Sequence, residues 1–395
     1  MARWQQITVV LMVAALVAAG CKKKQEGGEP APTPAADAAT APTPEQTPDA
    51  ATPPADVAQA VEAAAEATAE ATDATEHEPT FEELVAASKP LTPTITPQKA
   101  GDKEITADVC TFEGLELLGE SSMNVMNNIA VTSDGKLYVV DNDGQLMRFT
   151  FKEGDACVLV YDAAFGTAGK LKLDQEIETL NVDGNNKLYA SAGIWESFRL
   201  TEGAVDFKCE TDPNGYIVPR EDGKGGLAYW SRGELVKVAF TDTGCTGENW
   251  AFESPLDMVQ SVAFMNDLVL VGGSLKPEVN PNHEIVVVAF NKEGKPQFQL
   301  GSTAEGIDEQ TICWAHGLSA CPSGICVLDS NCRAMTTWND KGEFQAKIDL
   351  SELFGLRYPW YPDFQVVGDV TYVAAGQERE ESSVAQGFIF RVHGL

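Results

Sequence analysis

The chain has 395 residues and a formal net charge of -31, with 59 acidic against 28 basic residues. Nucleic-acid binding is excluded as a main function by this balance, because neutralising phosphates requires clustered Lys and Arg side chains. Hydrophobic residues make up 44% of the chain, which is enough to bury a sizeable core.

The first twenty residues follow the pattern of a secretory signal peptide. Arg3 supplies a positive charge, residues 7–17 are apolar, and small residues lead up to Cys21. The apolar run is too short to span a bilayer core, which needs about 20 apolar residues. A cysteine directly after Ala18-Ala19-Gly20 resembles the lipobox of bacterial lipoproteins. This resemblance implies cleavage before Cys21 and lipid attachment at that residue, so we expect an exported, membrane-anchored protein.

Three lysines follow the anchor, at positions 22–24. They are suited to contact anionic lipid headgroups, although a simple solvated charge run explains them equally well. In enteric-type lipoproteins, an Asp after the acylated Cys marks retention in the inner membrane. Lys22 differs from that pattern, so the resemblance implies an outer-membrane location, facing the periplasm or the cell surface.

Residues 21–98 form a segment rich in Ala, Pro, Thr and Glu, with almost no aromatic residues. Such a composition buries too little apolar surface to offset the entropy of ordering, which predicts a disordered tether. Residues 57–75 contain good helix formers, but an isolated helix of this kind is marginal in water. We therefore divide the chain into a signal peptide at 1–20, a tether at 21–98 and a folded domain at 99–395.

The folded domain consists of a recurring unit of short strands. The clearest copy spans residues 129–141, the next spans 180–190, and further copies follow at intervals of roughly 40–50 residues. Each copy has an apolar strand, a tight turn and a second strand, followed by two more strands. Four antiparallel strands repeated six times predict an all-β, six-bladed β-propeller. A β-sandwich is the main competing fold, but about 24 strands are too many for one.

The ring of blades has to be closed, and the sequence suggests how. The last unit stops at its third strand, residues 387–392, whereas residues 110–118 precede the first unit. We expect residues 110–118 to supply the missing fourth strand, so that an N-terminal strand closes the last blade. The domain is then expected to be monomeric.

The run Ser133-Asp134-Gly135-Lys136-Leu137-Tyr138, together with its second copy, resembles NHL-like and TolB-like six-bladed propeller repeats. The resemblance supports the fold and transfers no activity, because propellers carry many unrelated functions.

Eight cysteines follow the anchor, and an even count in an exported chain favours disulfides. Cys321 and Cys326 face each other across a turn, and Cys313 is expected to lie on the same face as Cys332. A zinc site is the alternative for these four, but their spacing lacks the usual C-x2-C pairs. The pairing of Cys110, Cys157, Cys209 and Cys245 stays open, with Cys110–Cys157 and Cys209–Cys245 preferred.

Propeller ligands usually bind where the loops entering the innermost strands converge. Long loops and an aromatic cluster gather on the same face here, which suggests a binding surface for a protein or glycan partner. The alternative is that Trp360 and Tyr361 only plug the channel. The candidate binding-face residues are Asn128, Glu178, Trp314, His316, Tyr358, Trp360, Tyr361 and Asp363.

An enzyme is the second hypothesis. Metal-dependent lactonases and gluconolactonases use six-bladed propellers, and Asn128, Glu178, His316 and Asp363 are candidate ligands for a divalent cation such as Ca²⁺. No Gly-x-Ser-x-Gly, phosphate-loop or His-Glu-x-x-His motif accompanies them. We therefore expect a lipid-anchored binding or scaffolding module of the cell envelope without cofactor or catalytic residues, and keep a metal-dependent hydrolase of small esters or lactones as the alternative.

Overall fold

A computed structural model describes residues 80–395, apart from short gaps at 119–122, 124–125, 155, 193–195, 202, 210–214, 231–232, 283, 304–306 and 381. Cys21, the signal peptide and the tether up to residue 79 lie outside the described residues. No helix in the described part of the chain is long and apolar enough to cross a membrane.

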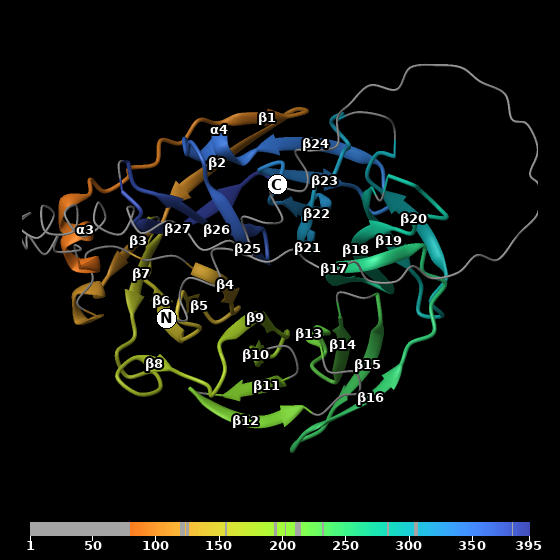
Figure 1. The fold of residues 1–395 in the computed structure, drawn as a ribbon, viewed down its shortest axis with the longest axis horizontal. Helices are drawn as coiled ribbons and strands as arrows, with labels where there is room; N and C mark the ends of the chain where they lie inside the picture. The colour runs from red at the N-terminus through yellow and green to blue at the C-terminus, as the bar shows by residue number, and fades with distance from the viewer. Residues whose placement is uncertain are drawn as a thin grey trace, which may run out of the picture. The chain divides into compact units, whose positions relative to one another are not determined.

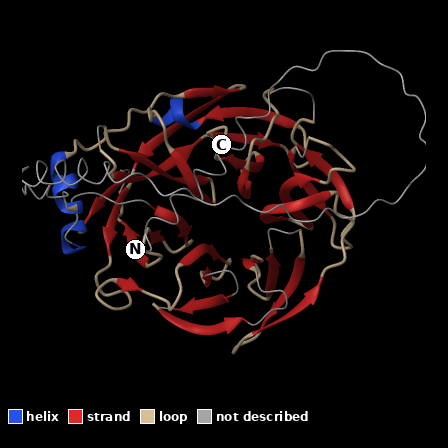
Figure 2. Cartoon of the chain, in the orientation of Figure 1, coloured by secondary structure: helices blue, strands red, loops and turns tan. Residues whose placement is uncertain are grey.

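The described chain is almost entirely β-structure (Figure 2), and its strands form six sheets arranged around a centre (Figure 1). Blade 1 contains β4 (Met126–Val131), β5 (Lys136–Asp141), β6 (Leu146–Phe151) and β7 (Val158–Tyr161). Blade 2 contains β9 (Ile177–Val182), β10 (Leu188–Ala192), β11 (Glu196–Thr201) and β12 (Ala204–Cys209). Blade 3 contains β13 (Tyr216–Pro219), β14 (Gly225–Tyr229), β15 (Leu235–Phe240) and β16 (Cys245–Asn249).

The second half of the ring has the same order. Blade 4 contains β17 (Leu256–Met265), β18 (Leu268–Leu275), β19 (Ile285–Phe290) and β20 (Pro296–Leu300). Blade 5 contains β21 (Ala315–Cys321), β22 (Gly324–Asp329), β23 (Ala334–Trp338) and β24 (Phe344–Asp349). Blade 6 contains β25 (Trp360–Val367), β26 (Val370–Glu378), β27 (Ala385–His393) and, from the N-terminal side, β2 (Lys103–Val109), with β1 (Gln98–Ala100) at its edge. The six-bladed propeller expected from the repeats is thus confirmed.

Burial follows the position of a strand within its blade. The second strands, such as β5 and β22, are buried along nearly their whole length, because each is covered on both faces by a neighbouring blade. The outermost strand β16 is exposed at four of its five residues. This gradient explains why the inner strands are apolar runs, whereas the outer strands are polar.

The core is divided into clusters that lie between adjacent blades. Phe388 and Phe390 of blade 6 pack against Leu328 of blade 5, and Ile389 of blade 6 packs against blade 1. The short helix α4 (Leu350–Phe354) covers the contact between blades 5 and 6, where the rings of Phe354 and Phe390 stack at 3.7 Å. Neighbouring blades therefore stabilise one another by burying apolar area.

An N-terminal strand closes the ring as expected, but it comes from a different segment. Strand β2 pairs with β27, with Thr106 opposite His393 and Val109 opposite Phe390. The expected segment, residues 110–118, instead forms β3 (Thr111–Glu113), which runs parallel to β7 at the edge of blade 1, and the 3-10 helix η1 (Leu115–Leu118). Gly114 ends β3 with a positive φ of 88°, which turns the chain away from an extended path.

The end of the segment assigned to the tether is ordered. Helix α3 (Phe81–Ala87) begins with a capping box between Thr80 and Glu83. Downstream, Thr96 N donates to Leu353 O at 2.9 Å, and Leu91 packs against the core between blades 5 and 6. The described part of the tether, residues 80–98, therefore belongs structurally to the propeller, because its few apolar residues find a partner surface there.

Blade 1 carries one further strand. The two-residue β8 (Lys170–Leu171) pairs with β6 in the long connection to blade 2.

Candidate functional site

Four of the candidate binding-face residues lie near the start of an innermost strand, at one mouth of the central channel. Asn128 is in β4, Glu178 in β9, His316 in β21 and Asp363 in β25. We call this side of the propeller the entry face, because the innermost strands enter the channel here.

Around half of the ring, these side chains join neighbouring blades through hydrogen bonds. Ile129 N of blade 1 donates to Asp363 Oδ2 of blade 6 at 3.1 Å. Leu180 N of blade 2 donates to Asn128 Oδ1 of blade 1 at 2.8 Å. Glu178 accepts a hydrogen bond of 2.7 Å from the hydroxyl of Tyr216, which belongs to blade 3.

The other half of the ring continues the pattern. The Tyr229 hydroxyl of blade 3 donates to Gln260 O of blade 4 at 3.4 Å, and Ala315 N of blade 5 donates to Gln260 Oε1 at 2.9 Å. His316 Nε2 donates to Pro362 O of blade 6 at 2.7 Å. Each blade is thus bonded to the next at the entry face, and the candidate residues there hold the ring together.

Asp363 is the carboxyl group most strongly affected by this arrangement. Burial raises its pKa to about 7, although hydrogen bonds from Ile129 N, Phe364 N and the Gln365 side chain oppose the shift. The nearby Tyr229 hydroxyl also has a raised pKa, mainly through burial and partly through Tyr216 and Asp363. A protonated Asp363 is a neutral group inside the ring of hydrogen bonds, which suits a structural role.

His316 has a lowered pKa, although its side chain is exposed. Burial of its surroundings lowers the pKa of the imidazole, and the hydrogen bond to Pro362 O opposes this shift only in part. With Nε2 donating to that carbonyl, the other ring nitrogen, Nδ1, carries the lone pair.

The residues proposed as ligands for a divalent cation are not brought together as a ligand set. Among the described residues, one group of three His, Cys, Asp or Glu side chains has ligand atoms close enough to hold a metal ion, and it consists of Cys313, Asp329 and Cys332. The two cysteines of this group form a disulfide, so they offer no thiolate. Glu178, His316 and Asp363 are not in this group, and each of them forms a hydrogen bond to a different neighbouring blade.

The aromatic cluster before β25 is divided between the interior and the surface. Tyr361 is only 1% exposed and packs near Phe354, so it is a core residue. Half-buried Trp360 lies over Gly376, where an added Cβ would come within 2.4 Å of the indole ring. Tyr358, in contrast, is 62% exposed.

Two guanidinium groups flank the exposed ring of Tyr358. The Cζ atoms of Arg357 and Arg333 lie 5.1 Å and 5.6 Å from its centroid. The backbone of Tyr358 is fixed, because its N–H donates to Gln377 Oε1 at 3.0 Å. We call Tyr358, Arg357 and Arg333 the tyrosine rim.

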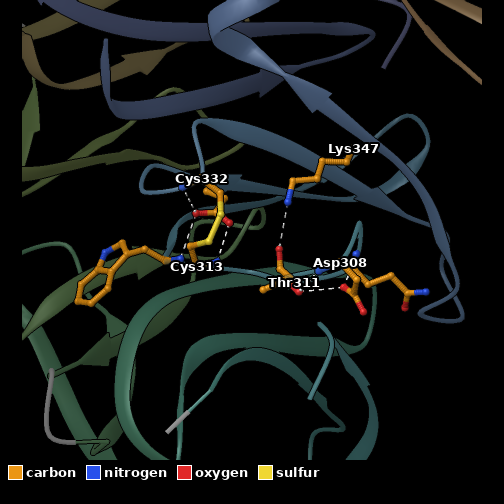
Figure 3. The surroundings of a disulfide bond; sticks show 8 residues. Asp308, Thr311, Cys313, Cys332 and Lys347 are labelled. Atoms are coloured by element: carbon orange, nitrogen blue, oxygen red, sulfur yellow. Dashed lines mark hydrogen bonds between the residues drawn. A yellow bond between two sulfur atoms is a disulfide. The ribbon is translucent and has the colours of Figure 1, made fainter. Parts of the chain in front are cut away.

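Trp314 is fixed on the entry face by a disulfide and a buried carboxylate. Figure 3 shows the bond between Cys313 and Cys332. The fully buried Asp329 accepts hydrogen bonds from Cys313 N at 2.7 Å, from Trp314 N at 3.0 Å and from Cys332 N at 3.0 Å. Burial raises the pKa of Asp329, although the hydrogen bonds from these three donors oppose the shift. The arrangement anchors the loop that carries Arg333 next to half-buried Trp314.

Further disulfides join the outer strands. Cys110 is paired with Cys157 across blades 6 and 1, and Cys209 is paired with Cys245 across blades 2 and 3. Their Cα atoms are 4.5 Å and 5.1 Å apart, so neighbouring outer strands approach each other closely at these points. Cys321 pairs with Cys326 within blade 5. The pairs coincide with those preferred from the sequence.

The opposite mouth of the channel, where the innermost strands end, is concave. A cavity of about 900 Å³ is lined there by the turns after these strands, and it contains Asp183, Glu221, Asp267, Asp369 and Arg220 among others. We call this side the exit face. Sequence reasoning missed it, because only the packing of the blades brings these turns together.

Comparisons with known proteins add little beyond the architecture. No family model matches the chain, and no curated protein matches its sequence. Among solved structures, the chain is similar to the WD40 β-propeller domain of Doa1, with 10% identity, a TM-score of 0.45, and coverage of 75% of this chain and 97% of that one. It is also similar to virginiamycin B lyase from Staphylococcus aureus, with 9% identity, a TM-score of 0.43, and coverage of 70% and 99%.

Proposed function

We propose that this protein is a lipid-anchored binding module of the cell envelope, whose propeller docks a protein partner on the tyrosine rim. The observation that carries the proposal is the exposed Tyr358 ring between two guanidinium groups. Tyr and Arg are the residue types that dominate the energetics of protein interfaces. A partner that covers Tyr358 buries its ring and presents carboxylates to Arg333 and Arg357.

The ring of hydrogen bonds favours this function over the hydrolase. Asn128 and Asp363 accept backbone N–H groups of adjacent blades, so their oxygens already have partners. A cation that recruited these oxygens would compete with the contacts between blades. The Cys21 signal and the disulfides support an exported location, since disulfides persist in oxidising compartments.

The proposal is tested by capture from native envelopes with the full chain and a Tyr358→Ala variant. We expect one stoichiometric protein partner, with at least a tenfold loss of capture in the variant, because an interface anchor is removed. Leu117→Ala is the matched control, since Leu117 is a large apolar residue that is 65% exposed in η1 and is not part of the tyrosine rim. A Cys21→Ser chain is expected to move to the soluble fraction.

Equal capture by both variants would exclude the tyrosine rim as the docking surface. Recovery of glycan without protein would replace the protein partner by a glycan. Measurable lactone turnover without any captured partner would favour the hydrolase instead.

A further inference from the structure

A second concave site lies between blades 3 and 4, independent of the tyrosine rim and open toward the exit face. It has a volume of about 400 Å³. The turn before β14 forms one wall, and the end of β17 and the start of β18 form the other. We call it the basic groove; its lining residues used below are Arg220, Lys224, Lys237, Trp250, Phe264 and Lys292.

The charge of the basic groove is opposite to that of the chain. Its lining has four cationic side chains and one carboxylate, Asp222, whereas the whole chain carries -31. Among the described residues, Arg220, Lys224 and Lys237 form no ion pair, and Lys292 pairs with the exposed Asp267 at 2.6 Å. Arg220 also contributes to the lowered pKa of Asp267, behind the larger effect of Lys292. Cations without a carboxylate partner are available to an external anion.

Aromatic rings lie beneath these cations. Lys237 Nζ is 5.4 Å from the centroid of the Trp250 ring, and Arg220 Cζ is 5.9 Å from that of Phe264. Leu227, Val238 and Val269 complete the apolar lining. The groove thus combines an apolar floor with a cationic rim, which is the arrangement that an amphipathic anion requires.

Two glycines of the groove lining, Gly225 and Gly226, lie close to the backbone of their own blade. An added Cβ would lie 2.3 Å from Val238 O at Gly225 and 2.2 Å from Val218 O at Gly226, so neither position accepts a side chain without backbone movement. The first two residues of β14 therefore contribute backbone alone to the lining of the groove. The volume of the groove is within the range of small-ligand pockets, roughly 300–1,000 Å³.

We infer that the basic groove binds a small organic anion, with its carboxylate or phosphate between Lys224, Lys237 and Arg220 and its apolar body against Trp250 and Phe264. The same chemistry is offered by a fatty-acid carboxylate and by an aromatic phosphate. The apolar part supplies affinity through burial, and the charges orient the ligand.

The experiment is calorimetric titration of the full chain with octanoate, with 1-naphthyl phosphate, with the neutral 1-naphthylmethanol and with inorganic phosphate. We expect at least one organic anion to bind at least tenfold more tightly than the neutral probe or phosphate, and its affinity to fall with added salt. Which anion binds more tightly distinguishes an acyl from an aromatic ligand.

A double variant, Lys224→Gln with Lys237→Gln, locates the site. Both side chains are exposed, so its melting temperature should match that of the wild type. We expect at least a tenfold loss of anion affinity in this variant, and no loss in the matched control Lys99→Gln with Lys341→Gln, whose lysines are also exposed but lie outside the groove. Equal affinity in both variants, equal binding of the neutral probe, or no binding of either anion at millimolar concentration would overturn the inference.

Discussion

The contact that closes the ring, between blades 6 and 1, differs sharply from the contact between blades 3 and 4. At the closing contact, a disulfide, a carboxylate-to-backbone bond and the cluster around Ile389 all join the two blades. Blades 3 and 4 also share an apolar cluster, but a groove that is lined by two glycines lies between them, and the hydrogen bond from Tyr229 to Gln260 O is long, at 3.4 Å. Side chains that join the blades at closure are thus unavailable for ligands, whereas the groove between blades 3 and 4 has cations that form no ion pair among the described residues.

Removing the closing disulfide should have the largest effect. Replacing Cys110 and Cys157 by Ala opens a loop with a sequence separation of 47. Chain entropy then predicts a loss of about 4 kcal/mol in the free energy of unfolding, measured by denaturant titration under oxidising conditions.

The matched control for that experiment is the Cys321–Cys326 pair, with a separation of 5. Its replacement by Ala should cost about 2 kcal/mol in the same entropic estimate. Equal losses of unfolding free energy in the two double variants would show that the Cys110–Cys157 disulfide stabilises the protein no more than the short-loop disulfide does.

Asp363 allows the hydrogen-bond ring to be tested by pH. Its pKa in the folded protein is raised from 3.8 to about 7. The folded state therefore binds more protons than the unfolded state between these values, so the contribution of Asp363 to stability is full below pH 4 and is lost as the pH rises through 7.

We expect the stability of Asp363→Asn relative to the wild type to rise by on the order of 2 kcal/mol between pH 4 and pH 8, because the amide carries no buried charge. The loss of one of the two oxygens that accept from Ile129 N and Phe364 N is the same at every pH and leaves this difference unchanged. Thermal melts of both proteins at several pH values measure the rise. A relative stability that is independent of pH would contradict the raised pKa.

Asp108 should give the smallest effect of the three. It lies on β2 and accepts hydrogen bonds from His393 Nε2 at 3.0 Å and from Arg391 Nη2 at 2.7 Å on β27. The bond from His393, followed by that from Arg391, lowers the pKa of Asp108. The stability from this group is thus present above its ordinary pKa and is lost as the pH falls through the lowered one.

Asp108→Asn is therefore expected to cost about 1 kcal/mol at pH 7, since the Asp108 side chain is 46% exposed and solvent screens the pair. Urea titrations at pH 7 and pH 2.5 measure the cost and its disappearance in acid. Lys103→Gln, an exposed change on the same strand, serves as the control. A cost that does not fall at all as the pH is lowered would point to packing instead of charge.

The propeller was predictable from the sequence because its repeats record local structure. Strand alternation and Asp-Gly turns are local signals that can be recognised from a few consecutive residues, as in the copy at 129–141. The closing strand was misplaced because residues 103–109 and 110–118 are both short and partly apolar, and only Gly114 marks where the extended path ends. The order of residues 80–98 was missed because composition does not reveal a partner surface on blades 5 and 6.

The sequence predicted where the candidate residues lie in the fold, but not what their side chains do. The repeats place Asn128, Glu178, His316 and Asp363 at corresponding ends of inner strands, but their use in bonds between blades depends on the angle at which the blades pack. Tyr358 and Tyr361 are three residues apart with the same chemistry, and only the fold decides that one is exposed and the other is core. The basic groove combines residues from separate repeats, so no local motif signals it.

The pairing of β2 with β27 also determines when the ring can close during synthesis. Asp108 and Arg391 are separated by 283 residues, so the first strand of the ring to be synthesised has to wait for nearly the last. Until then, β2 has an unpaired edge, and such edges are prone to pair with other chains. Contacts this distant along a chain also slow folding. Completion of the ring is therefore expected to be a late event in the maturation of each molecule, and the interval before it is the time of greatest vulnerability to aggregation.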